Sequence, residues 1–203
     1  MKAPVSRDPD TVRRRILDAA QAEFMAHGYE AASTNCITDH FGGSKATLFR
    51  HYASKEALLE AVVRRIAGQW ESALDWRSIA DGAPREWLEA VGVRTLGWIL
   101  GDEPIFIGRL AIAEGHKFPA LEHTFEETAA RPMRTMIARQ LRHWSQAGLL
   151  DCRHPLADAE HWIDLVVSGP VSRRLYGAPR LVGARLRSHV RRAVELFLDG
   201  CSR

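Results

Sequence analysis

Apolar residues recur at helical spacing along most of the chain, and the alternation typical of β-strands is nearly absent. In the first such stretch Val12, Ile16, Ala20 and Phe24 follow one another every four residues. Because a helical turn holds 3.6 residues, this spacing puts the four side chains on one face. We find no internal repeat or low-complexity segment. The pattern therefore predicts an all-α fold of about nine helices.

Start and stop signals divide the first part of the chain into four helices. Ser33, Ser44 and Ser54 each stand where a side-chain oxygen can cap a helix. Gly28 and the pair Gly42-Gly43 stand where glycine ends one, because glycine adopts positive φ without strain. The predicted helices span about 9–27, 34–41, 45–51 and 55–76. The fourth is long enough to link two domains.

The rest of the chain reads as about five helices, separated by turn signals. Pro132 interrupts the helical stretch 120–147, which predicts a kink or break just before it. The last two helices begin at His154-Pro155 and at Pro179. The predicted organisation is a helix-turn-helix domain (1–54), a linking helix (55–76) and a larger helical domain (77–203).

Charge and cysteine usage exclude several classes of protein. The formal net charge is only +3, and residues 1–65 hold ten basic against eight acidic side chains. A case for nucleic-acid binding therefore depends on where charges lie. The three cysteines are far apart and form no C-x-x-C pair, which argues against a disulfide framework or thiolate metal site. Without a signal peptide or an 18-residue apolar run, we expect a cytoplasmic protein with no membrane contact.

Residues 33–51 have the arrangement of a helix-turn-helix, in which two short capped helices flank a glycine-containing turn. In such a motif the second helix enters the major groove, while its cap and the following turn face phosphate. Ser44, Lys45, Thr47 and Arg50 are polar or cationic groups of the kind required. The alternative is a helical corner whose basic groups are merely solvated.

The same residues resemble a known family. The run GGSKATLFRHY at 42–52 and the run SKEAL at 54–58 are similar to the TetR family of repressors. Upstream, RILDAA at 15–20, Phe24, Gly28-Tyr29 and Ile37 also fall where that family has matching residues. The resemblance covers about 50 contiguous residues.

This resemblance implies roles for individual residues. Lys45, Thr47 and Phe49 would reach the major groove with Arg50 alongside, and Leu48 and Ile37 would be buried. His51, Tyr52 and Lys55 would hold the DNA backbone. Ser33 and Thr34, at the start of the helix 34–41, would contact phosphate through their hydroxyls. The predicted DNA-contacting set is Ser33, Thr34, Ser44, Lys45, Ala46, Thr47, Phe49, Arg50, His51, Tyr52 and Lys55.

Two residues depart from the family pattern. Gly43 stands where an apolar turn residue such as Val is usual, and Thr34 stands where an apolar residue is common. Both predict a weaker core in the small domain. The Gly-Gly turn further suggests a motif that becomes fully ordered only on DNA.

Residues 109–121, RLAIAEGHKFPAL, resemble the C-terminal domain of the AefR-like branch of the family. This resemblance implies ligand binding and a homodimer in which the last two helices of each subunit form a four-helix interface. A two-fold dimer would match a palindromic operator. The candidate interface residues, each of which could equally be core of a monomer, are Trp162, Leu165, Val166, Leu186, Val190, Val194 and Phe197.

Aromatic residues of the larger domain suggest an apolar effector pocket, although such residues at helical spacing are usually core. The candidates are Trp98, Phe106, Arg109, Phe125 and Trp144, with Arg109 as a possible partner for an acidic ligand. The arginine-rich run from Arg173 to Arg192 is more often a solvated face than a second nucleic-acid surface.

We expect no catalytic residues, metal or cofactor. No histidine pair has the spacing of metal ligands on one helical turn, and no nucleophile elbow, paired-carboxylate or phosphate-loop pattern occurs. The sequence predicts a ligand-responsive repressor whose partners are operator DNA, a small-molecule effector and a second copy of itself, coupled through the fourth helix. The rivals are a small helical ligand carrier or enzyme, and an architectural DNA binder without sequence preference.

Overall fold

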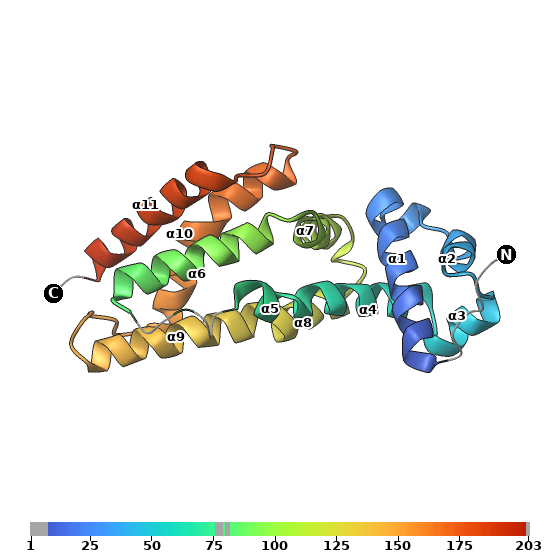
Figure 1. The fold of residues 1–203 in the computed structure, drawn as a ribbon, viewed down its shortest axis with the longest axis horizontal. Helices are drawn as coiled ribbons and strands as arrows, with labels where there is room; N and C mark the ends of the chain where they lie inside the picture. Colours follow the sequence, from blue (N-terminus) through green and yellow to red (C-terminus); the bar gives the residue numbers. More distant parts are fainter. Residues whose placement is uncertain (1–7, 76–78, 80–81, 202–203) are drawn as a thin grey trace. The chain divides into compact units, whose positions relative to one another are not determined.

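The computed structural model describes residues 8–75, 79 and 82–201. Within these ranges every regular element is a helix and no strand occurs, so the predicted all-α class is confirmed (Figure 1). When α4–α5 and α8–η2–α9 are each counted as one helix, the described residues hold the nine expected. The elements are α1 (Pro9–Ala31), α2 (Thr34–Phe41), α3 (Lys45–His51), α4 (Lys55–Gly68), α5 (Trp70–Leu74), α6 (Pro84–Ile99), α7 (Asp102–Glu114), α8 (Pro119–Phe125), η2 (Glu126–Ala130), α9 (Arg131–Gln146), α10 (Pro155–Leu175) and α11 (Gly183–Gly200).

The chain forms two compact units. The first, called here the head, comprises residues up to Ile66 together with Leu110–Thr124, and the second, the large unit, comprises Ala67–Arg109 with the residues from Phe125 onward. These boundaries differ from the predicted divisions at 54 and 76. The head takes in most of α4 and a distant segment, 110–124, that the sequence pattern assigned to the larger domain.

The core of the head forms because α1 buries one face against the short helices. Ile16, Ala20 and Phe24 on α1 are fully buried, as predicted from their spacing. The α1 backbone leaves helical geometry at Gly28, where φ is 74° and ψ is 176°. The positive φ is one that glycine adopts without strain, but ψ is extended, so the predicted left-handed stop at Gly28 is wrong: Gly28 kinks α1, which ends at Ala31 and not at residue 27.

An arginine fastens α4 to α1. The Arg65 guanidinium forms an ion pair of 2.6 Å with Asp18 and donates a hydrogen bond of 3.0 Å to the Leu17 carbonyl. It also bonds the Gln21 side chain. Because the guanidinium serves three acceptors on one face of α1, it holds this part of α4 against α1 within the head.

The turn after α2 corrects an expectation. Gly42 is left-handed, with φ of 71° and ψ of 38°, and the Gly42 and Gly43 amides donate to the Thr38 carbonyl at 3.1 and 3.2 Å. A Cβ at Gly43 would lie 2.0 Å from Cε2 of Phe41. The Phe41 ring therefore fills the space of the missing side chain, and Gly43 does not leave the core weaker. Thr34, the second departure, is half-buried.

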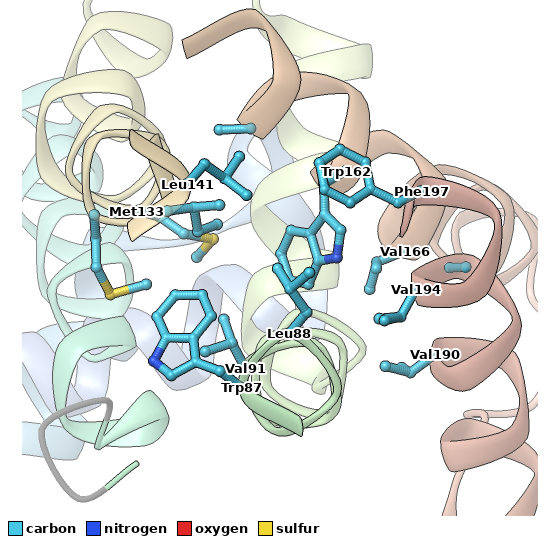
Figure 2. Packing of buried hydrophobic residues seen from close by; sticks show 14 of the residues in the cluster. Trp87, Leu88, Val91, Met133, Leu141, Trp162, Val166, Val190, Val194 and Phe197 are labelled. Carbon is cyan, nitrogen blue, oxygen red and sulfur yellow. The ribbon is translucent and has the colours of Figure 1, made fainter. Parts of the chain in front are cut away.

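The core of the large unit draws side chains mainly from α6, α9, α10 and α11, with further residues of α5 such as Trp70 and Leu74 (Figure 2). Its largest fully buried side chain is Trp162, which packs close to Gly92 of α6. The side chains labelled in the figure are Trp87, Leu88 and Val91 on α6, Met133 and Leu141 on α9, Trp162 and Val166 on α10, and Val190, Val194 and Phe197 on α11.

Two further helix boundaries, besides the end of α1, differ from the prediction. The predicted fourth helix, 55–76, is divided, because α4 ends at Gly68 and α5 starts at Trp70. Glycine has low helix propensity and so favours an interruption there; Trp76 lies outside the described residues. The last helix begins at Gly183, which has φ of 59°, and not at Pro179.

Pro132 changes the helix around it but does not end it. The predicted irregularity is a short π-helix, η2, directly before α9. In a regular α-helix the Thr128 carbonyl would accept from the amide of residue 132, which proline lacks. The indole N–H of Trp70 donates to this carbonyl at 2.8 Å. A side chain of α5 thus replaces the missing backbone donor.

This replacement predicts the effect of Trp70→Phe. Loss of the indole donor in a buried position should lower the free energy of unfolding by about 1–3 kcal/mol, measured by urea denaturation. Adding Pro132→Ala restores a backbone donor and should recover part of that loss. If the double variant is no more stable than Trp70→Phe, the hydrogen bond to Thr128 is not what stabilises this junction.

Candidate nucleic-acid interface

The short helix α3 is set up by its own sequence. The Ser44 side-chain oxygen caps it by accepting from the Thr47 amide at 3.1 Å, as expected from the serine's position. Leu48 is only 1% exposed and, with the fully buried Ile37 of α2, anchors the motif in the core of the head. Both burials were predicted. The helix is therefore held from one side, and its other side is presented outward.

The outward side of α3 carries cationic, small and aromatic side chains. Lys45, Ala46 and Arg50 are exposed, and Phe49 is 43% exposed although it is a large apolar residue. Thr47 and His51 are half-buried. Lysine and arginine can donate to guanine O6 and N7 or to phosphate, and an aromatic ring can contact a thymine methyl group. This face has the chemistry needed to read base edges in a major groove.

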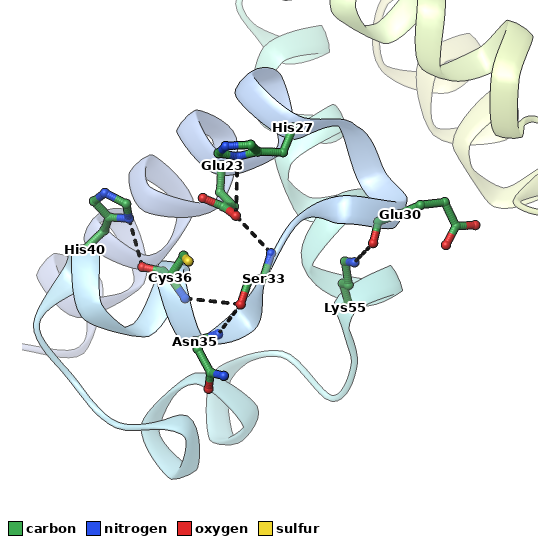
Figure 3. A network of polar contacts seen from close by, with 8 residues as sticks. All are labelled: Glu23, His27, Glu30, Ser33, Asn35, Cys36, His40 and Lys55. Atoms are coloured by element: carbon green, nitrogen blue, oxygen red, sulfur yellow. Dashed lines mark hydrogen bonds and ion pairs between the residues drawn. The ribbon is translucent and has the colours of Figure 1, made fainter.

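The N-terminus of α2 is less open to phosphate than predicted (Figure 3). The Ser33 side-chain oxygen accepts from the amides of Asn35 and Cys36 at 3.2 and 3.5 Å. The Ser33 amide donates to the Glu23 carboxylate at 2.9 Å. Glu23 is buried and lies 3.4 Å from His27. Because a carboxylate already uses this amide, Ser33 has only its hydroxyl proton to offer a phosphate.

Tyr52, the C-cap residue of α3, contacts an arginine that is not among the predicted DNA-contacting residues. Tyr52 is buried, and its hydroxyl accepts a hydrogen bond of 3.3 Å from Nε of Arg13. The Arg13 guanidinium also lies 5.9 Å from the centre of the Tyr52 ring. Arg13 is exposed and is therefore a cation beside the C-terminal end of α3. Arg13 and Tyr52 are 39 residues apart in the sequence, so their proximity depends on the fold of the head.

Lys55, predicted to hold phosphate, lies in a polar cluster at the end of α1. Its Nζ donates to the Glu30 carbonyl at 3.2 Å and lies 4.6 Å from the centre of the Tyr29 ring. The Tyr29 hydroxyl donates to Glu56 at 2.6 Å. That hydrogen bond lowers the pKa of Glu56 to about 2, while burial and then the bond to Glu56 raise the pKa of Tyr29.

The predicted pocket residues lie on four different helices, α6, α7, α8 and α9. Arg109 is exposed and donates to the carbonyls of Leu175 and Arg174, both at 3.3 Å, so its guanidinium serves the C-terminal end of α10. Trp144 is buried against Trp87, with ring centres 5.4 Å apart. The half-buried Trp98 and Phe125 pack against the core cluster, and Phe106 is half-buried on α7.

Six of the seven predicted interface residues lie inside the subunit. Their exposed fractions are between 0% and 6%, so the alternative given above, that they are core residues, describes their side chains. Leu165, 41% exposed on α10, is the one available to a partner. The six are Trp162, Val166, Leu186, Val190, Val194 and Phe197.

Among residues 8–75, 79 and 82–201, no group of three histidine, cysteine or acidic side chains is placed to hold a metal ion. In the same part of the chain, none of the helices combines the length and apolar character needed to cross a bilayer.

Known proteins match both parts of the chain. Residues 16–62 match the model of the bacterial regulatory proteins of the tetR family, and residues 86–200 match the AefR-like transcriptional repressor C-terminal domain. The transcriptional repressor AcnR of Corynebacterium glutamicum is 32% identical over 34% of this chain and 37% of its own length. The uncharacterised regulator YvkB of Bacillus subtilis is 23% identical over 93% of this chain and 96% of its own.

Solved structures agree over nearly the whole chain. A TetR-family regulator from Mesorhizobium loti superposes with a TM-score of 0.84 at 24% identity, covering 98% of this chain and all of that one. The regulator FrrA, described as flavonoid-responsive, gives a TM-score of 0.79 at 22% identity over 95% of this chain and 98% of its own. With its helix-turn-helix head and AefR-like C-terminal domain, the chain belongs to the TetR family of DNA-binding transcriptional regulators.

Proposed function

We propose that this protein is a ligand-responsive repressor that binds a palindromic operator as a homodimer. The observation that carries the proposal is the outward face of α3, where Lys45, Phe49 and Arg50 stand exposed while Leu48 anchors the helix from behind. A solvated helical corner gives no reason for an exposed phenylalanine between two cations. A groove-reading helix does, because it needs donors and an apolar contact side by side.

Selection of bound DNA from random sequence tests this proposal. A two-fold dimer presents two recognition helices, so the selected sites should contain inverted half-sites whose centres lie about one helical turn, roughly 34 Å, or a multiple apart. Enrichment of a single asymmetric site would contradict the dimeric part of the proposal. Binding with no enriched sequence would favour an architectural protein, and absence of binding would favour a carrier or enzyme.

The dimer is supported by exposed apolar side chains on the last two helices. Leu165 on α10 and Leu196 on α11 are 41% and 47% exposed. Apolar side chains on helices that the family uses for dimerisation are suited to burial against a second copy.

Leu165→Glu should therefore weaken the dimer. A charge at a buried position of a symmetric interface appears twice and faces its own copy, so the dissociation constant should rise by about tenfold or more. Analytical ultracentrifugation measures this constant. The control is Ile112→Glu, which puts the same charge at an apolar position that is 74% exposed on α7. Equal dissociation constants for both variants would remove Leu165 from the interface.

The ligand response is proposed from the fold. FrrA shares it and is described as responsive to a flavonoid. We propose a small apolar effector bound in the large unit, whose core holds the buried Thr95 hydroxyl and Trp162 indole N–H without hydrogen-bond partners. Buried donors of this kind are suited to an acceptor on a ligand. Operator affinity measured across a panel of flavonoids and other small aromatic compounds tests the response, which fails if every compound that binds leaves the affinity unchanged.

A further inference from the structure

Segment 110–124 contacts the end of α1 through two neighbouring side chains, all within the head. Lys117 Nζ lies 2.8 Å from Oε1 of Glu30 and 2.9 Å from Oε2 of Glu114. The Phe118 ring packs edge-on against Tyr29, with ring centres 4.7 Å apart at 71°. The hydrogen bond from Lys117, followed by its charge, lowers the pKa of Glu30. Lys117 thus neutralises the Glu30 carboxylate.

Glu30 contacts two lysines, one through its carboxylate and one through its backbone carbonyl. Its carboxylate pairs with Lys117, and its backbone carbonyl accepts from Lys55 at 3.2 Å. Lys55 also contributes to the lowered pKa of Glu30, so its charge already acts on that carboxylate. Lysine has a flexible four-carbon stem and can redirect its ammonium group. If Lys117 were absent, the free Glu30 carboxylate would attract Lys55.

We propose that Lys117 is a positioning residue for DNA binding, because by pairing with Glu30 it leaves the Lys55 ammonium available to a DNA phosphate. The inference depends on the proposed operator binding. It adds a route of regulation, since 110–124 continues into the large unit at both of its ends. An effector that withdraws Lys117 from Glu30 would redirect Lys55 and weaken DNA binding, a route separate from α4.

Four variants test the proposal: Lys55→Gln, Lys117→Gln, Glu30→Gln and the double variant Lys117→Gln with Glu30→Gln. Operator affinity is measured by fluorescence anisotropy as a function of salt, using DNA obtained by selection. Removing one phosphate contact should lower the association constant roughly fourfold per subunit at about 0.2 M salt and reduce the log–log salt slope by about 0.9. Lys117→Gln should match Lys55→Gln in both quantities.

The decisive comparison is with Glu30→Gln. This variant breaks the same ion pair but leaves no free carboxylate, so it should bind DNA like the wild type. The double variant should regain wild-type affinity and salt slope. If the ion pair only stabilised the fold, Glu30→Gln would be as harmful as Lys117→Gln and the double variant would not recover; either result overturns the proposal. Wild-type affinity in Lys117→Gln would overturn it as well.

Arg153→Gln is the matched control, because it removes one positive charge from an ion pair with Asp151, lies outside the head and outside α10 and α11, and is 80% exposed. It should leave operator affinity and salt slope unchanged, and an equal loss in this control would reduce the effect of Lys117 to one of net charge. Lys117 and Glu30 are 46% and 66% exposed, so their variants should fold, and thermal melting checks this for all four. Failure of the wild type to bind any selected sequence would refute the proposed function itself and is distinct from these outcomes.

Discussion

Replacing Lys45 and Arg50 together by alanine is expected to lower operator affinity by about two orders of magnitude. Both side chains are exposed on the outward face of α3. A well-formed contact to a base contributes roughly 1–3 kcal/mol of discrimination, so two lost contacts give an effect of this size. The affinity for unrelated DNA should fall less, because contacts to base edges form on the operator and not on unrelated DNA. The ratio of specific to nonspecific affinity should therefore decrease. Competition anisotropy against operator and scrambled DNA measures both.

The control for this pair is Arg185→Ala with Arg191→Ala, which removes two exposed arginines from α11. If α3 reads the operator, the α11 variant keeps full operator affinity as long as analytical ultracentrifugation shows it to be dimeric, and the α3 variant keeps its melting temperature. An α11 variant that stays dimeric and loses as much operator affinity would assign DNA binding to the arginine-rich helix. An α3 variant that loses stability would mean that its side chains hold the head together.

The second large effect is expected from Gly43→Val, which introduces the residue type common at this position in the family. A Cβ there would lie 2.0 Å from the Phe41 ring, so the ring must leave its place in the core of the head. Overpacking of this kind costs typically 1–3 kcal/mol, and the displaced ring should also disturb the turn that sets α3. We expect a lower free energy of unfolding in urea together with a loss of operator binding.

The two side chains at this turn should compensate each other. Phe41→Ala alone creates a cavity, but combined with Gly43→Val it leaves room for the valine. The double variant should therefore lose less free energy of unfolding than the two single variants lose in sum. Gly97→Ala on α6 is the control, because a Cβ there meets nothing within 4 Å. Strict additivity of the two substitutions would show that Phe41 and Gly43 do not share this space.

The sequence was informative about the fold wherever a local signal decided the structure. Serine caps placed the starts of α2 and α3, and the spacing of apolar residues identified the buried face of α1. Local signals were insufficient at Gly68 and Pro132. A helical period continues across Gly68, so the break could not be located, and the indole that donates to the Thr128 carbonyl before Pro132 comes from Trp70, a residue far away in the sequence.

The candidate DNA-binding surface could be predicted in part, for the same reason. The polar face of α3 follows from the motif, because the residues are consecutive. The cap at Ser33 could also be predicted, but its closure by Glu23 could not, since that contact forms only when α1 folds back on α2. Arg13 beside Tyr52 and Lys117 beside Glu30 are likewise tertiary contacts, 39 and 87 residues apart in sequence.

The interface and pocket residues show the limit of periodicity. A helix that packs on two neighbours has apolar residues on more than one side, so the pattern cannot distinguish a face buried in the subunit from one buried in a dimer. Trp162 and Val194 proved to be core, whereas Leu165, with the same apolar character, is exposed. Arg109 was chosen for its charge, but its position beside the α10 carbonyls depends on the three-dimensional fold.

Protection of guanine N7 from methylation by dimethyl sulfate is the most direct test of the claim that α3 lies in the major groove. With operator DNA obtained by selection, we expect two clusters of protected guanines, related by two-fold symmetry and separated by about one helical turn or a multiple of it. Protection should be lost in the Lys45→Ala, Arg50→Ala variant. Operator binding that leaves every guanine N7 reactive while shielding the minor groove would contradict the account.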